Sequence, residues 1–207
     1  MSQKAKSWLL VVAALAGVWL IRHGAGAQLI PPQPTAAQAF ADGPQLQPGS
    51  PVAEPLKPSA PVRIRIPSIR VDAPIMRLGL GADGSLDVPP ARNRNVVGWY
   101  RDGTPPGSKG SAIVAGHVDN AQGPSVFYNL GTLQKGSTVE VVRRDGRTAV
   151  FSLDATEVYE SKNFPDKRVY GASPYASLRL ITCGGGFSKK TGYQGNVVAY
   201  AHLTEVR

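Results

Sequence analysis

The stretch Ser177-Leu-Arg-Leu-Ile-Thr-Cys183-Gly-Gly-Gly-Phe187 carries the only cysteine of the chain. Its alternating, β-branched pattern predicts a strand that brings Cys183 to an exposed end. The glycines that follow predict a sharp backbone turn and leave room for another chain to approach the sulfur. A thiol with a pKa of about 8.5 is mostly protonated at neutral pH, so a nucleophilic Cys183 needs an activating partner. The alternative is a lone cysteine that packs as a small hydrophobe.

Composition excludes several classes of function. The 207 residues suit one domain with appendages. The net charge is +9, but the basic residues are scattered and are not interleaved with aromatic residues, which argues against nucleic-acid binding. One cysteine rules out an internal disulfide framework. The three histidines lie far apart and the acidic residues form no cluster, so we expect neither a metal site nor a cofactor.

The N-terminal residues predict export. Lys4 and Lys6 precede an uncharged apolar stretch, residues 7–21, which is short for a membrane span of about 20 residues but is extended by the neutral residues after His23. We interpret residues 1–27 as a single-pass membrane anchor with its N-terminus inside the cell. The alternative is a signal peptide cleaved near Ala25-Gly-Ala27. Either reading places the rest of the chain outside the cytoplasm.

Residues 28–61 hold nine of the 18 prolines of the chain. Such a segment builds neither sheet ladders nor a helix and tends toward extended polyproline II. We therefore predict a disordered linker that holds a domain, residues 62–207, away from the membrane.

Residues 62–207 predict a mainly β fold. Many short strands separated by Gly and Pro turns indicate a closed or sandwich-like architecture. Arg144-Asp-Gly-Arg147 predicts a hairpin turn between two of these strands. One or two short helices are expected, with helical signals at residues 125–133 and a short turn near 173–176. The expected strands cover residues 62–67, 73–78, 96–100, 111–117, 138–143, 148–153, 179–183 and 196–202.

His117 is the candidate partner of Cys183. It ends the apolar strand Ile113-Val-Ala-Gly-His117, just as Cys183 ends its own strand. Two side chains at the ends of two strands of one barrel can meet although 66 residues separate them. A histidine can accept the thiol proton and later protonate a leaving amine. Asp119 either orients the imidazole or turns the loop, and the turn is favoured.

Two motifs together, Ala115-Gly-His-Val-Asp119 and Leu180-Ile-Thr-Cys-Gly-Gly185, resemble those of a sortase, specifically the class F type of actinobacteria. The similarity extends over residues 62–207 and includes Ile66-Pro-Ser-Ile69, Val97-Gly-Trp-Tyr100, Gly123-Pro-Ser-Val-Phe-Tyr128 and Asn196-Val-Val-Ala-Tyr200. The anchor and the Pro-rich linker also match the layout of this family. The resemblance implies a closed eight-stranded β-barrel.

The resemblance also implies a cysteine transpeptidase on the outer face of the cell membrane. Cys183 would attack the Thr–Gly carbonyl of a Leu-Pro-x-Thr-Gly-like signal near the C-terminus of a secreted protein, and His117 would protonate the departing amine. Thr182 and Asp119 would support the pair. An amine of a peptidoglycan precursor or a pilin would then resolve the thioacyl intermediate, and water would give hydrolysis.

The chain departs from the sortase pattern at one position. Sortases carry an arginine on the strand after the cysteine loop, and residues 187–196 contain none. Gln194 or Asn196 stands near the expected position, and Lys190 or Lys189 could reach in from the loop. An amide donates hydrogen bonds to an oxyanion but brings no charge.

Two further interpretations stay open. Without the arginine, the domain could be a weak or silent sortase-like module that binds sorting signals. A thiol hydrolase of cell-wall peptides is disfavoured, because that class usually has its cysteine before its histidine.

Overall fold

A computed structural model describes residues 30–41, 46 and 49–207, and residues 31–207 form one compact unit. The predicted anchor, residues 1–27, lies outside the described residues, as do positions 42–45 and 47–48 of the predicted linker. In the described part of the chain, no helix is both long and apolar enough to cross a membrane.

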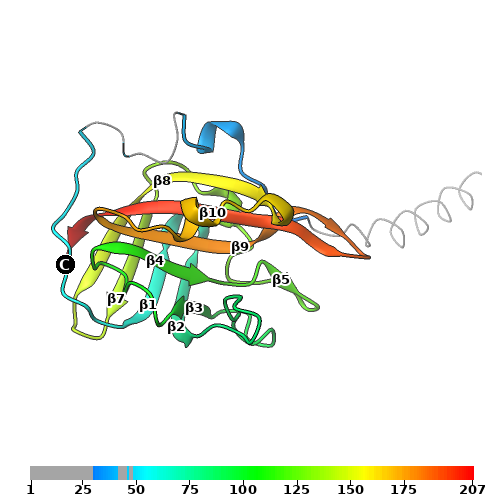
Figure 1. Cartoon of the computed structure of the whole chain (residues 1–207), viewed down its shortest axis with the longest axis horizontal. Helices are drawn as coiled ribbons and strands as arrows, with labels where there is room; N and C mark the ends of the chain where they lie inside the picture. The colour runs from blue at the N-terminus through cyan, green and yellow to red at the C-terminus, as the bar shows by residue number, and fades with distance from the viewer. Residues whose placement is uncertain (1–29, 42–45, 47–48) are drawn as a thin grey trace, which may run out of the picture. The chain divides into compact units, whose positions relative to one another are not determined.

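Eight strands close a barrel in the order β1-β2-β3-β4-β9-β10-β8-β7, which confirms the predicted architecture (Figure 1). The barrel strands are β1 Pro61–Ile66, β2 Val71–Leu78, β3 Val97–Tyr100, β4 Gly110–Ala115, β7 Thr138–Arg143, β8 Thr148–Glu160, β9 Ala176–Ser188 and β10 Gly192–Val206. A small separate hairpin pairs β5 (Asp119–Asn120) with β6 (Gly123–Pro124). The turn 144–147 joins β7 to β8 as predicted.

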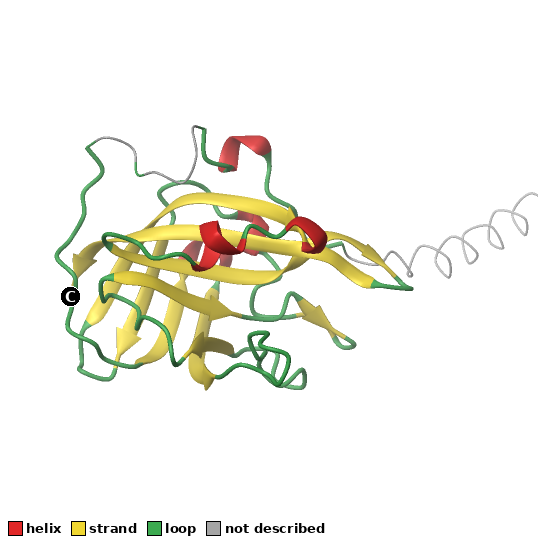
Figure 2. Cartoon of the chain, viewed as in Figure 1, coloured by secondary structure: helices red, strands yellow, loops and turns green. Residues whose placement is uncertain are grey.

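Helices are few and short (Figure 2). Among the described residues there is one α-helix, α2, at Asp166–Tyr170. The helix expected over residues 125–133 is reduced to the single 3₁₀ turn η3, and at the short turn expected near 173–176 the chain bends into β9. The 3₁₀ turns are η1 Ala36–Gln38, η2 Pro67–Ile69, η3 Leu130–Thr132 and η4 Ser161–Asn163.

Because side chains alternate along a strand, each barrel strand has one face toward the barrel interior and one face outside it. In β1, Ile64 and Ile66 are fully buried in the barrel interior, whereas Arg65 between them is exposed. In β9, Leu178 and Leu180 belong to this interior core. Ile181 belongs instead to a second apolar cluster, which lies on the outer face of the sheet because neighbouring residues of a strand point to opposite faces.

The strand that carries Cys183 is longer than the sequence predicts. β9 runs through Cys183 to Ser188 and pairs with β10 almost to the hairpin turn. The glycines do not end the strand; they form a bulge, in which Gly185 and Gly186 on β9 oppose the single residue Gln194 on β10. Both glycines have positive φ, 74° and 96°, a conformation that a bulge tolerates most easily without a Cβ.

The described parts of residues 28–61 lie against the barrel, which differs from the expected extended linker. Gln38 is only 3% exposed, and Leu56 belongs to the interior core. The backbone of Ala53 bonds to Leu203, and that of Leu56 bonds to Gly107. Proline prevents regular secondary structure here, but it does not prevent side chains from packing on a preformed surface.

A buried arginine, Arg143, joins the Pro-rich segment to the barrel by hydrogen bonds. The Arg143 side chain, at the end of β7, is fully buried. Its guanidinium donates to the carbonyl of Pro106 at 2.5 Å, to that of Lys57 at 2.5 Å and to the carboxylate of Asp145 at 3.0 Å. One cation therefore joins three chain segments.

We expect Arg143→Met to lower the free energy of unfolding by about 2–4 kcal/mol, because two carbonyl oxygens lose a charged donor. The neighbouring Arg144 is exposed, so Arg144→Met is the matched control and should change stability by about 0.5 kcal/mol or less. Urea denaturation of the full chain measures both variants. Equal effects of the two substitutions would contradict this role for Arg143.

Candidate active site

Cys183 lies on the outer face of the barrel. It is two residues beyond Ile181, so both side chains point away from the interior core. Cys183 is exposed and forms no disulfide. Its thiol is therefore accessible to another molecule.

Parallel pairing of β4 with β9 brings His117 beside Cys183. Ala115 pairs with Ile181 at the end of β4. The register continues past β4, because the Gly116 N–H donates to the Ile181 carbonyl at 3.1 Å and the Thr182 hydroxyl donates to the Gly116 carbonyl at 2.8 Å. His117 and Cys183 are the next residues along the two segments, so they emerge at the same edge of the sheet. Thr182 holds the register here, a supporting role.

On the other side of Cys183 lies Asn196. The two residues are paired in the antiparallel register of β9 with β10. The Asn196 amide is 3.5 Å from the Thr182 carbonyl, a weak contact that keeps it next to β9. Gln194 is the exposed bulge residue and Lys190 lies in the exposed hairpin turn. Lys189 is exposed in the same turn, so of the four candidates for the missing arginine Asn196 is the one directly opposite Cys183.

The imidazole of His117 is held by a loop. Its Nε2 lies 2.6 Å from the carbonyl oxygen of Pro89, in the connection between β2 and β3. A carbonyl oxygen only accepts, so Nε2 carries the proton of this hydrogen bond. The neutral ring then has its lone pair on Nδ1, which is available to take a proton.

Asp119 bonds to a tyrosine and not to the imidazole. The Tyr193 hydroxyl on β10 donates to the Asp119 carboxylate at 2.5 Å. Asp119 also pairs with Pro124 in the small hairpin, as the first residue of β5. Burial raises the pKa of Tyr193, and its hydrogen bond to Asp119 adds to this effect. Tyr193 was not identified from the sequence, because 74 residues separate it from Asp119 and it belongs to no recognisable motif.

The surroundings of the thiol disfavour its ionisation. Although Cys183 is exposed, the protein atoms around it partly desolvate the thiol and raise its pKa, and the negative charge of Asp119 raises the pKa further. Both causes disfavour the thiolate. A reaction at Cys183 therefore requires that a neighbouring base take its proton, and His117 is the adjacent group.

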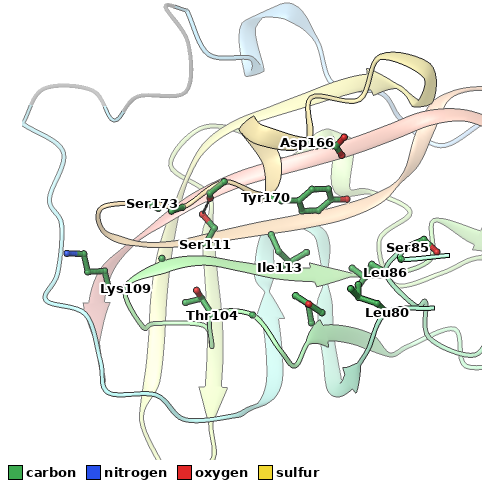
Figure 3. A pocket seen from close by; sticks show the side chains of 16 residues that line it. Leu80, Ser85, Leu86, Thr104, Lys109, Ser111, Ile113, Asp166, Tyr170 and Ser173 are labelled. Atoms are coloured by element: carbon green, nitrogen blue, oxygen red, sulfur yellow. Dashed lines mark hydrogen bonds between the residues drawn. The ribbon is translucent and has the colours of Figure 1, made fainter. Parts of the chain in front are cut away.

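A pocket lies along the same outer face. It has a volume of about 830 Å³, within the range of small-ligand sites (Figure 3). Ile113 and Ser111 of β4 form its floor, Leu80 and Leu86 line it from the β2–β3 connection, and Tyr170 lines it from α2. Ile113 is four residues before His117, so the pocket begins about 13 Å from the histidine along β4.

A thiol and an imidazole that follow the ends of two paired strands are the minimum set of groups for cysteine-dependent acyl transfer. Among the described residues, no group of acidic, histidine and cysteine side chains could hold a metal ion. Nothing in the arrangement calls for a cofactor.

The comparisons with known proteins agree with this class. A family model described as the sortase domain matches residues 64–204, and the chain belongs to the sortase family. It is accordingly an enzyme, a cysteine transpeptidase. No curated protein sequence matches the chain.

Solved sortase structures share the fold at low identity. Sortase A from Corynebacterium diphtheriae is 20% identical over 72% of this chain and 62% of that protein, with a TM-score of 0.53. Sortase A from Listeria monocytogenes is 18% identical over 72% of this chain and 90% of that one, with a TM-score of 0.54. Sortase E1 from Streptomyces coelicolor, solved with a tripeptide in its active site, is 19% identical over 72% and 90%, with a TM-score of 0.53.

We expect Asp119→Asn to lower the pKa of Cys183, because removing the carboxylate charge removes one of the two causes that disfavour the thiolate. Iodoacetamide alkylation followed against pH measures this pKa cleanly, since the chain has one cysteine. The alkylation profile should shift to lower pH, and alkylation at pH 7 should become faster. Asp102→Asn, at an exposed acid in the β3–β4 connection, is the control. An unchanged profile for Asp119→Asn would contradict the electrostatic role of Asp119.

Proposed function

We propose that this sortase is of the class F type and is anchored in the cell membrane by residues 1–27, with its catalytic domain outside the cell. It cleaves a Leu-Pro-x-Thr-Gly-like sorting signal of secreted proteins and joins the product to an amine of a peptidoglycan precursor or a pilin. The observation that carries this proposal is the register of β4 with β9, after which His117 and Cys183 follow at the same end of the two strands.

The first half of the reaction forms a thioester. Cys183 gives its proton to Nδ1 of His117, and the thiolate attacks the carbonyl carbon between Thr and Gly. The imidazolium then donates this proton to the glycine nitrogen as the C–N bond breaks. The acyl group stays on Sγ of Cys183, and the glycine fragment leaves as an amine.

The second half reverses the proton movements. An incoming amine attacks the thioester carbonyl and loses a proton to His117, and the Cys183 thiolate leaves and is protonated again. Water in place of the amine gives a free carboxylate. The pocket beside Ile113 supports a path for the signal along β4, because an apolar side chain upstream of the cleaved bond can lie among Leu80, Leu86 and Tyr170.

Asn196 is the proposed replacement for the family arginine. Its position opposite Cys183 supports a role in which the amide N–H donates to the oxyanion that forms on the attacked carbonyl. The amide carries no positive charge, so it stabilises this oxyanion less than a guanidinium would. This same feature favours the second candidate function, a weakly active or silent module that binds sorting signals.

We expect Cys183→Ala to abolish cleavage of a fluorogenic Leu-Pro-x-Thr-Gly peptide by the full chain in detergent. The covalent peptide adduct seen by mass spectrometry in the wild type should disappear as well. Ser188→Ala, on the same strand, is the control and should retain activity. Cleavage that survives Cys183→Ala would refute the mechanism. Peptide affinity without any wild-type adduct would favour the binding module.

We expect Asn196→Ala to lower kcat by about 10²-fold with little change in KM, as for the loss of one oxyanion donor. Gln194→Ala, at the exposed bulge residue two positions earlier, should leave both constants within about twofold of the wild type. Steady-state kinetics on the same peptide distinguishes the two variants. A larger loss in Gln194→Ala than in Asn196→Ala would reassign the role to Gln194.

A further inference from the structure

Residues 31–40, here called the N-terminal strap, cross the barrel next to the site. The strap passes beside β8 and approaches the β9–β10 hairpin (Figure 1). Gln38 is buried and forms a capping box with Thr35. Phe40 packs edge-on against Tyr200 at a centroid distance of 5.2 Å. The strap is therefore fixed at several points on the barrel.

One fixed point is the bulge that follows Cys183. The side-chain carbonyl of Gln33 accepts the backbone N–H of Gly185 at 2.9 Å. A bulge leaves a strand residue without its ladder partner, so such an N–H needs an acceptor from elsewhere. The amide nitrogen of Gln33 donates to the Pro31 carbonyl at 2.9 Å, which orients the side chain toward Gly185.

A second fixed point of the strap is the segment that supports His117. The Gln38 side-chain amide donates to the Gly131 carbonyl at 2.8 Å and to the Leu133 carbonyl at 2.7 Å. These carbonyls belong to the segment around η3. The same segment holds the histidine loop, because the Phe127 N–H donates to the His117 carbonyl at 3.0 Å.

We propose that Gln33 and Gln38 are positioning residues, with which the N-terminal strap holds the Cys183 strand and the His117 loop in register. The inference rests on the proposed function, since it concerns the same catalytic pair. Gln33 secures the backbone two residues after the nucleophile, and Gln38 secures the segment that supports the histidine. Neither side chain contacts the pocket beside Ile113. The strap contacts the backbone of the segments that carry the two reacting side chains, so we expect it to affect kcat and not KM.

The test compares the full chain with three variants. Gln33→Met keeps the size of the side chain and removes the acceptor for Gly185. Gln33→Glu restores an acceptor at the same reach. Gln38→Met removes both donors to the η3 segment, at a position distant in sequence from Gly185. Gln134→Met is the matched control, because it removes only one exposed local hydrogen bond to the η3 segment, from Gln134 to the Thr132 carbonyl, and none from the strap.

Two readouts are needed, peptide cleavage kinetics and hydrogen exchange at the Gly185 amide. Gln33→Met should lower kcat about tenfold at unchanged KM, because small misplacements of reacting groups are costly. It should also lose protection at Gly185, and Gln33→Glu should recover both. Gln38→Met should reduce Gly185 protection as well, which a purely local role of Gln33 would not explain. Gln134→Met should match the wild type.

The outcomes separate this inference from the proposed function. A kcat of Gln33→Met within twofold of the wild type would overturn the positioning role, whatever happens to Gly185 exchange. If the wild type cleaves no sorting peptide, the proposed function fails. Gly185 exchange and the Cys183 alkylation rate, which need no peptide, then decide the inference: both unchanged in Gln33→Met would overturn it, and both altered would support it.

Discussion

The parallel pairing of β4 with β9 is the interaction on which the candidate active site depends. Parallel strands end at the same edge of a sheet, so residues that follow their paired positions emerge together. The register from Gly110 opposite Ala176 to Ala115 opposite Ile181 fixes which residues emerge. A slip of one residue would turn Cys183 toward the interior core, since side chains alternate between the faces. The fold thus sets the geometry of the pair before any side-chain contact contributes.

The surroundings of Cys183 disfavour the thiolate. The thiol has a raised pKa, and the Asp119 carboxylate, whose charge contributes to this, is bonded to Tyr193 and not to His117. The arrangement therefore differs from a triad in which a carboxylate orients the histidine. The nucleophile therefore acts through a small thiolate population or through proton transfer during attack. An uncharged Asn196 opposite the sulfur adds no positive charge that would shift this balance.

The sequence predicts the barrel and the catalytic pair because both depend on local patterns. Alternation identifies β1, β4 and β9, and two motifs locate His117 and Cys183. The same patterns misplace the end of β9, since three glycines favour a turn as readily as a bulge, and only the pairing with β10 distinguishes the two. Contacts such as Tyr193 with Asp119 and Gln33 with Gly185 join residues far apart in sequence. No local sequence pattern predicts these contacts. The proline content of residues 31–40 likewise does not show that they pack on the barrel.

The raised pKa of Cys183, the only cysteine of the chain, also determines how the protein reacts with oxidants. Thiolates, not thiols, react readily with peroxide, so a raised pKa slows oxidation of Cys183 in the absence of substrate. A sulfenic acid that did form at Cys183 would find no second cysteine within the chain to condense with as a disulfide. Recovery would then depend on an external thiol. A nucleophile that ionises only during the reaction is thus both reactive toward its substrate and resistant to oxidation.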